Sequence, residues 1–181
     1  MILDKQLELS AAQNVGQVIG TYASSNIIDL YLLNGWAPGA NGILPANAGA
    51  RDMGIGDTPA LKIFAAMVAA FVSAGGGTLQ VHFQGAPDDG TGNPGTYVTY
   101  VSSPIYAVAA LTAGARLLDI DWPRPPAGVV MPRFVRLLYQ VATANATLGT
   151  VNAYVVLDRQ DQIVSAAVYQ SAYPPGLVVN N

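Results

Sequence analysis

The sequence predicts an all-β protein: a jelly-roll-type antiparallel β-sandwich with long loops and extended termini. Nineteen glycines and twelve prolines, many of them in clusters, interrupt the chain and leave short intervals between turns. Most intervals read as short β-rich runs and lack the long period of an amphipathic helix. A chain of 181 residues is long enough to form one domain, residues 1–181, whose core needs no disulfide or metal.

Eight segments are predicted as strands. In residues 79–84, apolar Leu79, Val81 and Phe83 alternate with polar side chains, as in a strand with one buried face. Residues 151–157 mix the pattern, which is typical of a strand covered on both faces. The predicted strands are residues 26–33, 60–72, 78–84, 96–101, 105–111, 115–120, 133–141 and 151–157. Two sheets built from them would bury their inner faces against each other.

Residues 60–74 are ambiguous between strand and helix. Leu61, Phe64, Met67, Val68 and Phe71 have helical spacing, and the alanines between them favour helix. We favour a strand, followed by a loop at the three glycines 75–77. The next strand, residues 78–84, would then pair with it as a hairpin.

The remaining segments are expected to be loops and extended ends. Residues 34–56 hold six glycines and two prolines without a periodic pattern, and a loop of that length tends to contact a partner. Residues 85–95 are a polar turn region, and the prolines stiffen residues 122–126. Residues 1–24 are predicted as an N-terminal arm and residues 161–181 as an extended C-terminal tail.

The composition is unusually apolar for a water-soluble surface. Hydrophobic residues make up 51% of the chain and charged residues 10%, and the mean hydropathy is +0.34. The longest apolar run, residues 63–72, falls short of the roughly 18 residues that a membrane helix needs, so no membrane association is expected. The apolar excess therefore predicts a homo-oligomer or a protein partner, with a dimer slightly favoured over a trimer. The N-terminus lacks a secretory signal, so the protein is expected to be made and kept in the cytosol.

The charges argue against nucleic-acid binding. The net charge is -3, and the eight basic residues are scattered from Lys5 to Arg159 rather than clustered. Six of the eight are arginines, which form good ion pairs where they are partly desolvated. Arg116, Arg133 and Arg136 are thus candidates for ion pairs within the chain or for interface contacts, and the nine tyrosines are also typical of interfaces.

Residues that would support catalysis are scarce, so no enzyme activity, cofactor or metal is expected. The chain has one histidine, His82, on the wetter side of a predicted strand, and no cysteine. The glycines at 54, 56 and 75–77 lack the strand-to-helix context and the lysine of a phosphate loop. The acidic pairs Asp88-Asp89 and Asp119/Asp121 favour turns or a solvated strand end, with a weak Ca²⁺ site as the alternative.

An ordered series of short motifs resembles one protein family. The motifs begin with residues 3–13 and 25–30 (SNIIDL) and continue with Arg51-Asp52 in RDMGIG and with residues 78–81. They end with residues 111–116 (LTAGAR), 133–139 (RFVRLLY) and 149–160, which contain Asp158-Arg159. Together they resemble the capsid cement (decoration) proteins of Bordetella-type podoviruses and related tailed phages, although the loops at 33–47 and 85–97 are longer here.

The resemblance implies a structural protein of the virion that catalyses nothing. It implies a jelly-roll homo-oligomer on the outer surface of the phage capsid, bound to an HK97-like shell of major capsid protein. The alternatives are a phage tail or baseplate sandwich and a carbohydrate-binding β-sandwich module. In a jelly roll only loops, edges and tails are free to contact a partner, so the predicted capsid or oligomer interface comprises Arg51, Asp52, Trp122, Asp158, Arg159, Tyr169 and Tyr173.

Overall fold

The computed structural model describes residues 7–30, 61–129 and 132–156. Within these ranges the protein is nearly all β, with one short 3-10 helix, η2 (Val108–Ala110). The strands are β1 (Glu8–Asn14), β2 (Gly20–Ala23), β3 (Ile28–Asp29), β4 (Lys62–Val72), β5 (Thr78–Ala86), β6 (Val98–Ser102), β7 (Tyr106–Ala107), β8 (Arg116–Asp121), β9 (Phe134–Ala142) and β10 (Leu148–Val156). The predicted all-β sandwich is confirmed.

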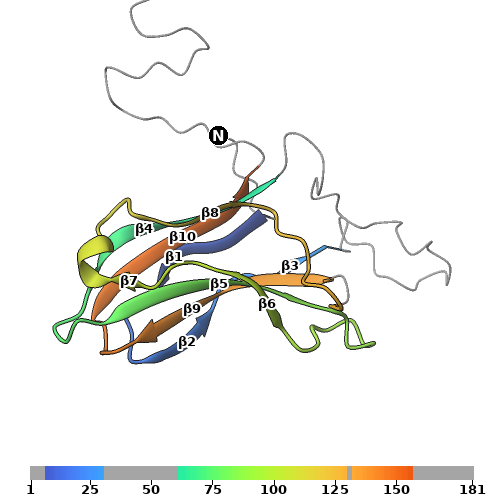
Figure 1. The fold of residues 1–181 in the computed structure, drawn as a ribbon, viewed down its shortest axis with the longest axis horizontal. Coiled ribbons are helices and arrows are strands. Elements are labelled where there is room, and N and C mark those ends of the chain that lie inside the picture. Colours follow the sequence, from blue (N-terminus) through green and yellow to red (C-terminus); the bar gives the residue numbers. More distant parts are fainter. Residues whose placement is uncertain (1–6, 31–60, 130–131, 157–181) are drawn as a thin grey trace, which may run out of the picture.

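Two antiparallel sheets pack face to face, as Figure 1 shows. The first sheet has the strand order β1-β10-β4-β8. The second has the order β2-β9-β5-β6, with the two-residue strands β3 on β9 and β7 on β5. First and last strands pair with each other, and so do the next strands inward: β1 with β10, β2 and β3 with β9, β4 with β8, and β5 with β6. This nested pairing, folded over into two sheets, is the jelly-roll arrangement.

The core lies between the sheets because each long strand alternates. On β5, Leu79, Val81 and Phe83 are fully buried, whereas Gln80 and His82 lie on the outer face. On β9, the buried side chains are those of Val135, Leu137, Tyr139 and Val141. On β4 and β10 they are those of Ile63, Ala65, Met67, Phe71, Val151, Ala153 and Val155. The two inner faces form one continuous apolar cluster.

Residues 62–72 are a strand, as predicted, but the predicted hairpin with residues 78–84 is wrong. β4 lies between β10 and β8 in the first sheet, and β5 lies next to β9 in the second. Residues 75–77 therefore carry the chain from one sheet to the other. Both strands bury one face in the common core; β4 pairs with β8 and β10, and β5 pairs with β9 and with β6, the strand that follows it. The free energy gained by burying both strands in the core outweighs that of pairing β4 directly with β5.

Two further predictions need correction. The N-terminal arm, residues 1–24, is wrong for residues 8–14 and 20–23, because β1 and β2 pair with β10 and β9 inside the sandwich. Leu9 and Val15 are fully buried, so this segment contributes to the core. The strand predicted at 105–111 is only Tyr106–Ala107, followed by η2. The loop at 34–56 and the tail at 161–181 lie outside the described residues.

In the part of the chain that the structure describes, no helix has the length and hydropathy needed to cross a membrane.

Candidate functional site

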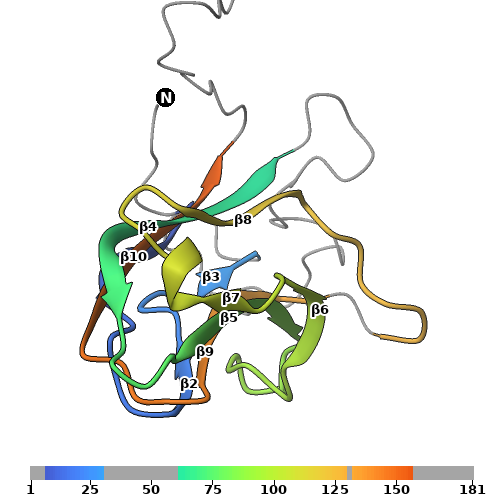
Figure 2. The same ribbon diagram turned by 60° about the vertical axis from the view of Figure 1, so that its left-hand side comes forward.

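Among the residues that the structure describes, one end of the sandwich carries no charged residue. Four connections meet there: residues 15–19, 73–77, 108–115 and 143–147, none of which contains Asp, Glu, Lys or Arg. In Figure 1 this is the end of the ribbon where η2 lies, and Figure 2 brings it forward. Large apolar side chains are exposed on it, namely Val18, Ile19, Val72 and Leu148, and Val68 is exposed nearby on β4. We call residues 15–19, 72–77, 108–115 and 143–148 the uncharged end.

Hydrogen bonds hold the uncharged end together. The backbone N–H of Ala146 donates to the carbonyl of Gln17 at 2.9 Å, and that of Thr147 donates to the carbonyl of Val72 at 2.8 Å. The side chain of Asn145 accepts from the backbone N–H of Ile19 at 2.9 Å. These bonds fix the loops relative to one another, so the exposed apolar side chains sit on an ordered surface.

Charged pairs lie toward the opposite end of the sandwich. Arg133, just before β9, donates to both carboxylate oxygens of Asp29 and also contacts Asp88. The Arg133 and Asp29 side chains are each 10% exposed. Lys62 and Asp121 form an exposed pair at 3.0 Å where β4 and β8 meet. The molecule is therefore polarised, with charged pairs toward one end and the uncharged end at the other.

The acidic pair Asp88-Asp89 forms a turn, as the sequence predicts. The Asp88 carboxylate accepts from the backbone N–H groups of Gly90 and Gly92, and Asp89 accepts from Thr91. Hydrogen bonds from Gly92 and Gly90, and then Arg133, lower the pKa of Asp88 below its usual value. Asp88 is thus bound by backbone amides and an arginine of its own chain.

His82 has polar neighbours on the outer face of the second sheet. Its Nδ1 lies 2.7 Å from the Ser102 hydroxyl and its Nε2 lies 3.1 Å from the Gln140 side-chain oxygen. The fold thus brings a serine to the single histidine, which the sequence did not predict. The third group is a neutral amide, and an amide cannot stabilise an imidazolium as the carboxylate of a catalytic triad does. The three side chains therefore form a hydrogen-bond network on the strand surface.

Arg136 on β9 differs from Arg133 in its contacts. Its guanidinium lies 3.6 Å from the centre of the Tyr97 ring, and its Nε donates to Gln84 at 3.0 Å. The Gln84 amide in turn donates to the Thr99 hydroxyl at 3.1 Å. No carboxylate pairs with Arg136 among the residues that the structure describes. Of the two arginines, Arg133 forms ion pairs within the chain and Arg136 is held by neutral groups.

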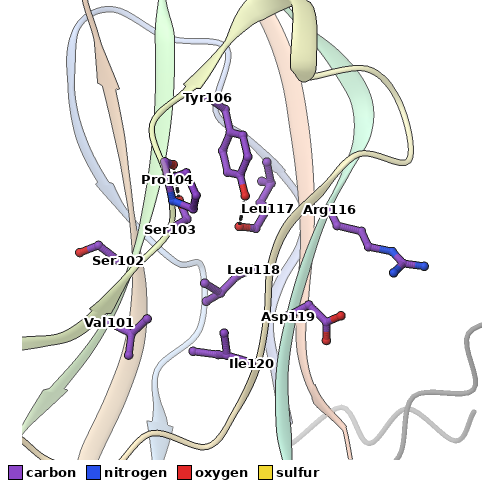
Figure 3. A pocket seen from close by; sticks show the side chains of 10 residues that line it. All are labelled: Val101, Ser102, Ser103, Pro104, Tyr106, Arg116, Leu117, Leu118, Asp119 and Ile120. Atoms are coloured by element: carbon purple, nitrogen blue, oxygen red, sulfur yellow. Dashed lines mark hydrogen bonds between the residues drawn. The ribbon is translucent and has the colours of Figure 1, made fainter.

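A groove opens between the sheets where the edge strand β8 faces residues 101–106 (Figure 3). Its volume is about 290 Å³. Leu118 and Ile120 lie on the side of β8 toward Val101, whereas Arg116 and Asp119 point away from the groove. The Tyr106 hydroxyl donates to the carbonyl of Leu117 at 3.1 Å and thereby satisfies a backbone oxygen of the edge strand. The groove is an opening at a sheet edge that is lined by both aliphatic and polar residues.

Of the seven predicted interface residues, the structure describes only Trp122. Trp122 is a correction: it is 7% exposed and packs edge-to-face on Phe83, with 5.2 Å between ring centres. The chain returns over the open end of the core just after β8, so this aromatic side chain is buried there rather than presented to a partner. The other six, Arg51, Asp52, Asp158, Arg159, Tyr169 and Tyr173, lie outside the described residues.

Sequence reasoning missed the uncharged end. Its four loops are separated by up to about 130 positions, so no local motif joins them. The only signal available was the absence of charge from residues 15–28, 63–81 and 137–156.

Asp119 and Asp121 lie on β8, and no cluster of three or more metal-binding side chains occurs among the described residues.

Compared with protein-family models and with curated proteins, the chain matches none of them.

Proposed function

We propose that this chain is a structural cement protein of a tailed-phage head, which binds the outside of the major capsid protein shell and stabilises the mature capsid. The observation that carries the proposal is the uncharged end, an ordered surface with exposed Val18, Ile19, Val72 and Leu148. Apolar side chains gathered on a charge-free surface are typical of a protein interface. The ordered series of family-like motifs supplies the identity of the partner.

The role of such a protein is mechanical. The shell is repetitive, so each weak contact is repeated around the head. A subunit that touches two shell proteins makes the second contact at a high effective concentration, and the sum becomes strong without any single tight contact. A rigid sandwich suits this role because it transmits force between its two ends without deforming.

The experiment is an occupancy assay on phage heads. Heads lacking this protein are incubated with purified wild-type chain or with the double variant Val72→Glu/Leu148→Glu. Wild-type protein is expected to bind and to raise the temperature at which the heads release DNA. The double variant should remain folded, because both side chains are exposed, and should lose occupancy because two buried carboxylates would lie in the interface.

Ile27→Glu is the matched control. Ile27 is also an exposed aliphatic residue, but it lies next to β3, away from the uncharged end. It should retain full occupancy. If wild-type protein fails to bind the heads, the cement function is wrong; if the double variant binds as wild type does, the assigned surface is wrong.

A further inference from the structure

Arg136 lies on the outer face of the second sheet in a fixed orientation. The residue pairs directly with Gln84 of the neighbouring strand β5, so both side chains project from the same face. Its guanidinium is stacked on Tyr97, and its Nε donates to the Gln84 side-chain oxygen. Arginine side chains on a surface are usually free to rotate, and this one is held at two points.

The network behind Arg136 fixes which atom of Gln84 it meets. The Gln84 side-chain nitrogen donates to the Thr99 hydroxyl, so the amide oxygen must face the guanidinium. Gln84 itself is 8% exposed, so this support is buried and not easily rearranged. The rotamer entropy that a partner would otherwise have to remove is already lost in the folded protein.

The two terminal nitrogens of Arg136 remain as donors. The contacts above use the flat face of the guanidinium group, which lies over the Tyr97 ring, and its Nε; among the described residues no acceptor is paired with either Nη. Two parallel N–H groups in one plane match the two oxygens of a carboxylate. The guanidinium group is therefore preorganised to bind a carboxylate.

The surroundings favour a single carboxylate over a polyanion. Arg136 is the one Lys or Arg on the described strands of this sheet, and the side chains that contact it, those of Tyr97 and Gln84, are neutral. A phosphate backbone would need several cations in a row, and the whole chain carries a net charge of -3. A single carboxylate on a protein surface requires only one arginine guanidinium.

We propose that Arg136, stacked on Tyr97 and oriented by Gln84, is a preformed site for the carboxylate of an Asp or Glu side chain on the shell protein. The identity of that partner rests on the proposed function, whereas the site itself does not. It gives the subunit a second contact, polar and directional, on a different surface from the uncharged end. Together the two contacts would fix both the position and the orientation of the subunit on the shell.

The first test uses the purified full chain and acetate as the probe. Nitrogen-15 NMR should show the Arg136 Nε–H resonance displaced by the Tyr97 ring, and acetate should shift the Arg136 side-chain resonances saturably relative to chloride at equal ionic strength. Arg124, which is exposed in the 122–129 segment, serves as the internal control and should shift much less. Tyr97→Leu and Gln84→Ala should each reduce the acetate response of Arg136 while the backbone spectrum keeps its dispersion.

The outcomes separate the site from the function. Equal acetate responses of Arg136 and Arg124, or a stronger response to phosphate than to acetate, would overturn the carboxylate site. On phage heads, Arg136→Gln and Arg136→Lys should each bind about tenfold more weakly than wild type, while Arg124→Gln binds normally. Unchanged binding of both Arg136 variants would remove the shell protein as the partner. Failure of wild-type protein to bind heads would refute the cement function and leave the acetate result standing.

Discussion

Arg133 and Asp29 form a buried ion pair that ties the start of β9 to β3, with the guanidinium Nη2 and the carboxylate Oδ2 3.0 Å apart. The guanidinium Nε also donates to the same carboxylate, and Asp88 contacts the other side of the guanidinium. One side chain thus joins a short strand, a long strand and the β5–β6 turn.

Removing one partner of this pair should be strongly destabilising. Arg133→Met is expected to lower the free energy of unfolding by about 3 kcal/mol or more, because the buried Asp29 carboxylate would lose the guanidinium that donates to both of its oxygens. Urea denaturation of the purified variants measures the change. The double variant Arg133→Met/Asp29→Leu should recover part of the loss. A single variant as stable as wild type would show that the pair contributes nothing.

The turn at Asp88 should make the fold less stable in acid. Backbone hydrogen bonds from Gly92 and Gly90 lower the pKa of Asp88 from 3.8. The charged carboxylate therefore favours the folded state above the unfolded pKa, and this stabilisation is lost as the pH falls through the lower folded value. Unfolding midpoints measured below about pH 4 should decline less for Asp88→Asn than for wild type. An NMR titration that places the Asp88 pKa at or above 3.8 would contradict this.

Gly16 should tolerate no side chain. A Cβ built there would lie 2.3 Å from the backbone carbon of Leu148, which cannot move without displacing β10. Gly16→Ala is expected to cost about 1 to 3 kcal/mol of stability and to disturb the uncharged end. Gly20→Ala is the control, because the atom nearest to its Cβ would be the Tyr22 hydroxyl, at an ordinary contact distance of 3.4 Å. Thermal unfolding of both variants gives the comparison, and equal melting temperatures would refute the steric argument.

Trp122 should behave as a core residue. Trp122→Ala is expected to reduce stability by about 3 to 5 kcal/mol, because it leaves a cavity beside Phe83. Trp122→Phe should cost less because it retains a ring. Equilibrium denaturation measures both. A stability loss below about 0.5 kcal/mol for Trp122→Ala is the result expected of a surface residue and would exclude the core assignment.

The apolar composition predicts self-association. With 51% hydrophobic and 10% charged residues, the purified chain is expected to sediment as a homo-oligomer at micromolar concentration. Val72→Glu/Leu148→Glu should leave the sedimentation coefficient unchanged, because the uncharged end is assigned to the shell. A monomeric wild-type protein would speak against the oligomer, and a variant that dissociates would place the contact between copies at this end.

Local patterns in the sequence were sufficient for the strands with strict alternation. Leu79, Val81 and Phe83 identify β5 because burial of every second side chain is a property of the strand itself. The turn at Asp88-Asp89 was also predictable, since aspartates bond to nearby backbone amides. Residues 8–14 were missed as a strand because β1 is irregular: its register with β10 shifts twice, and Ala12 has a positive φ of 44°.

Tertiary structure decided everything that depends on distant partners. The sequence alone determined an all-β sandwich with a charge-poor surface, because composition and alternation are carried by each residue and its neighbours. Only the fold decided that β4 and β5 lie in different sheets, that Trp122 covers the core, and that Arg133 is paired while Arg136 is stacked on Tyr97. It also gathered four separate uncharged loops onto one end. Contacts between residues far apart in the chain set these features, and no short stretch of sequence records which partner each side chain will meet.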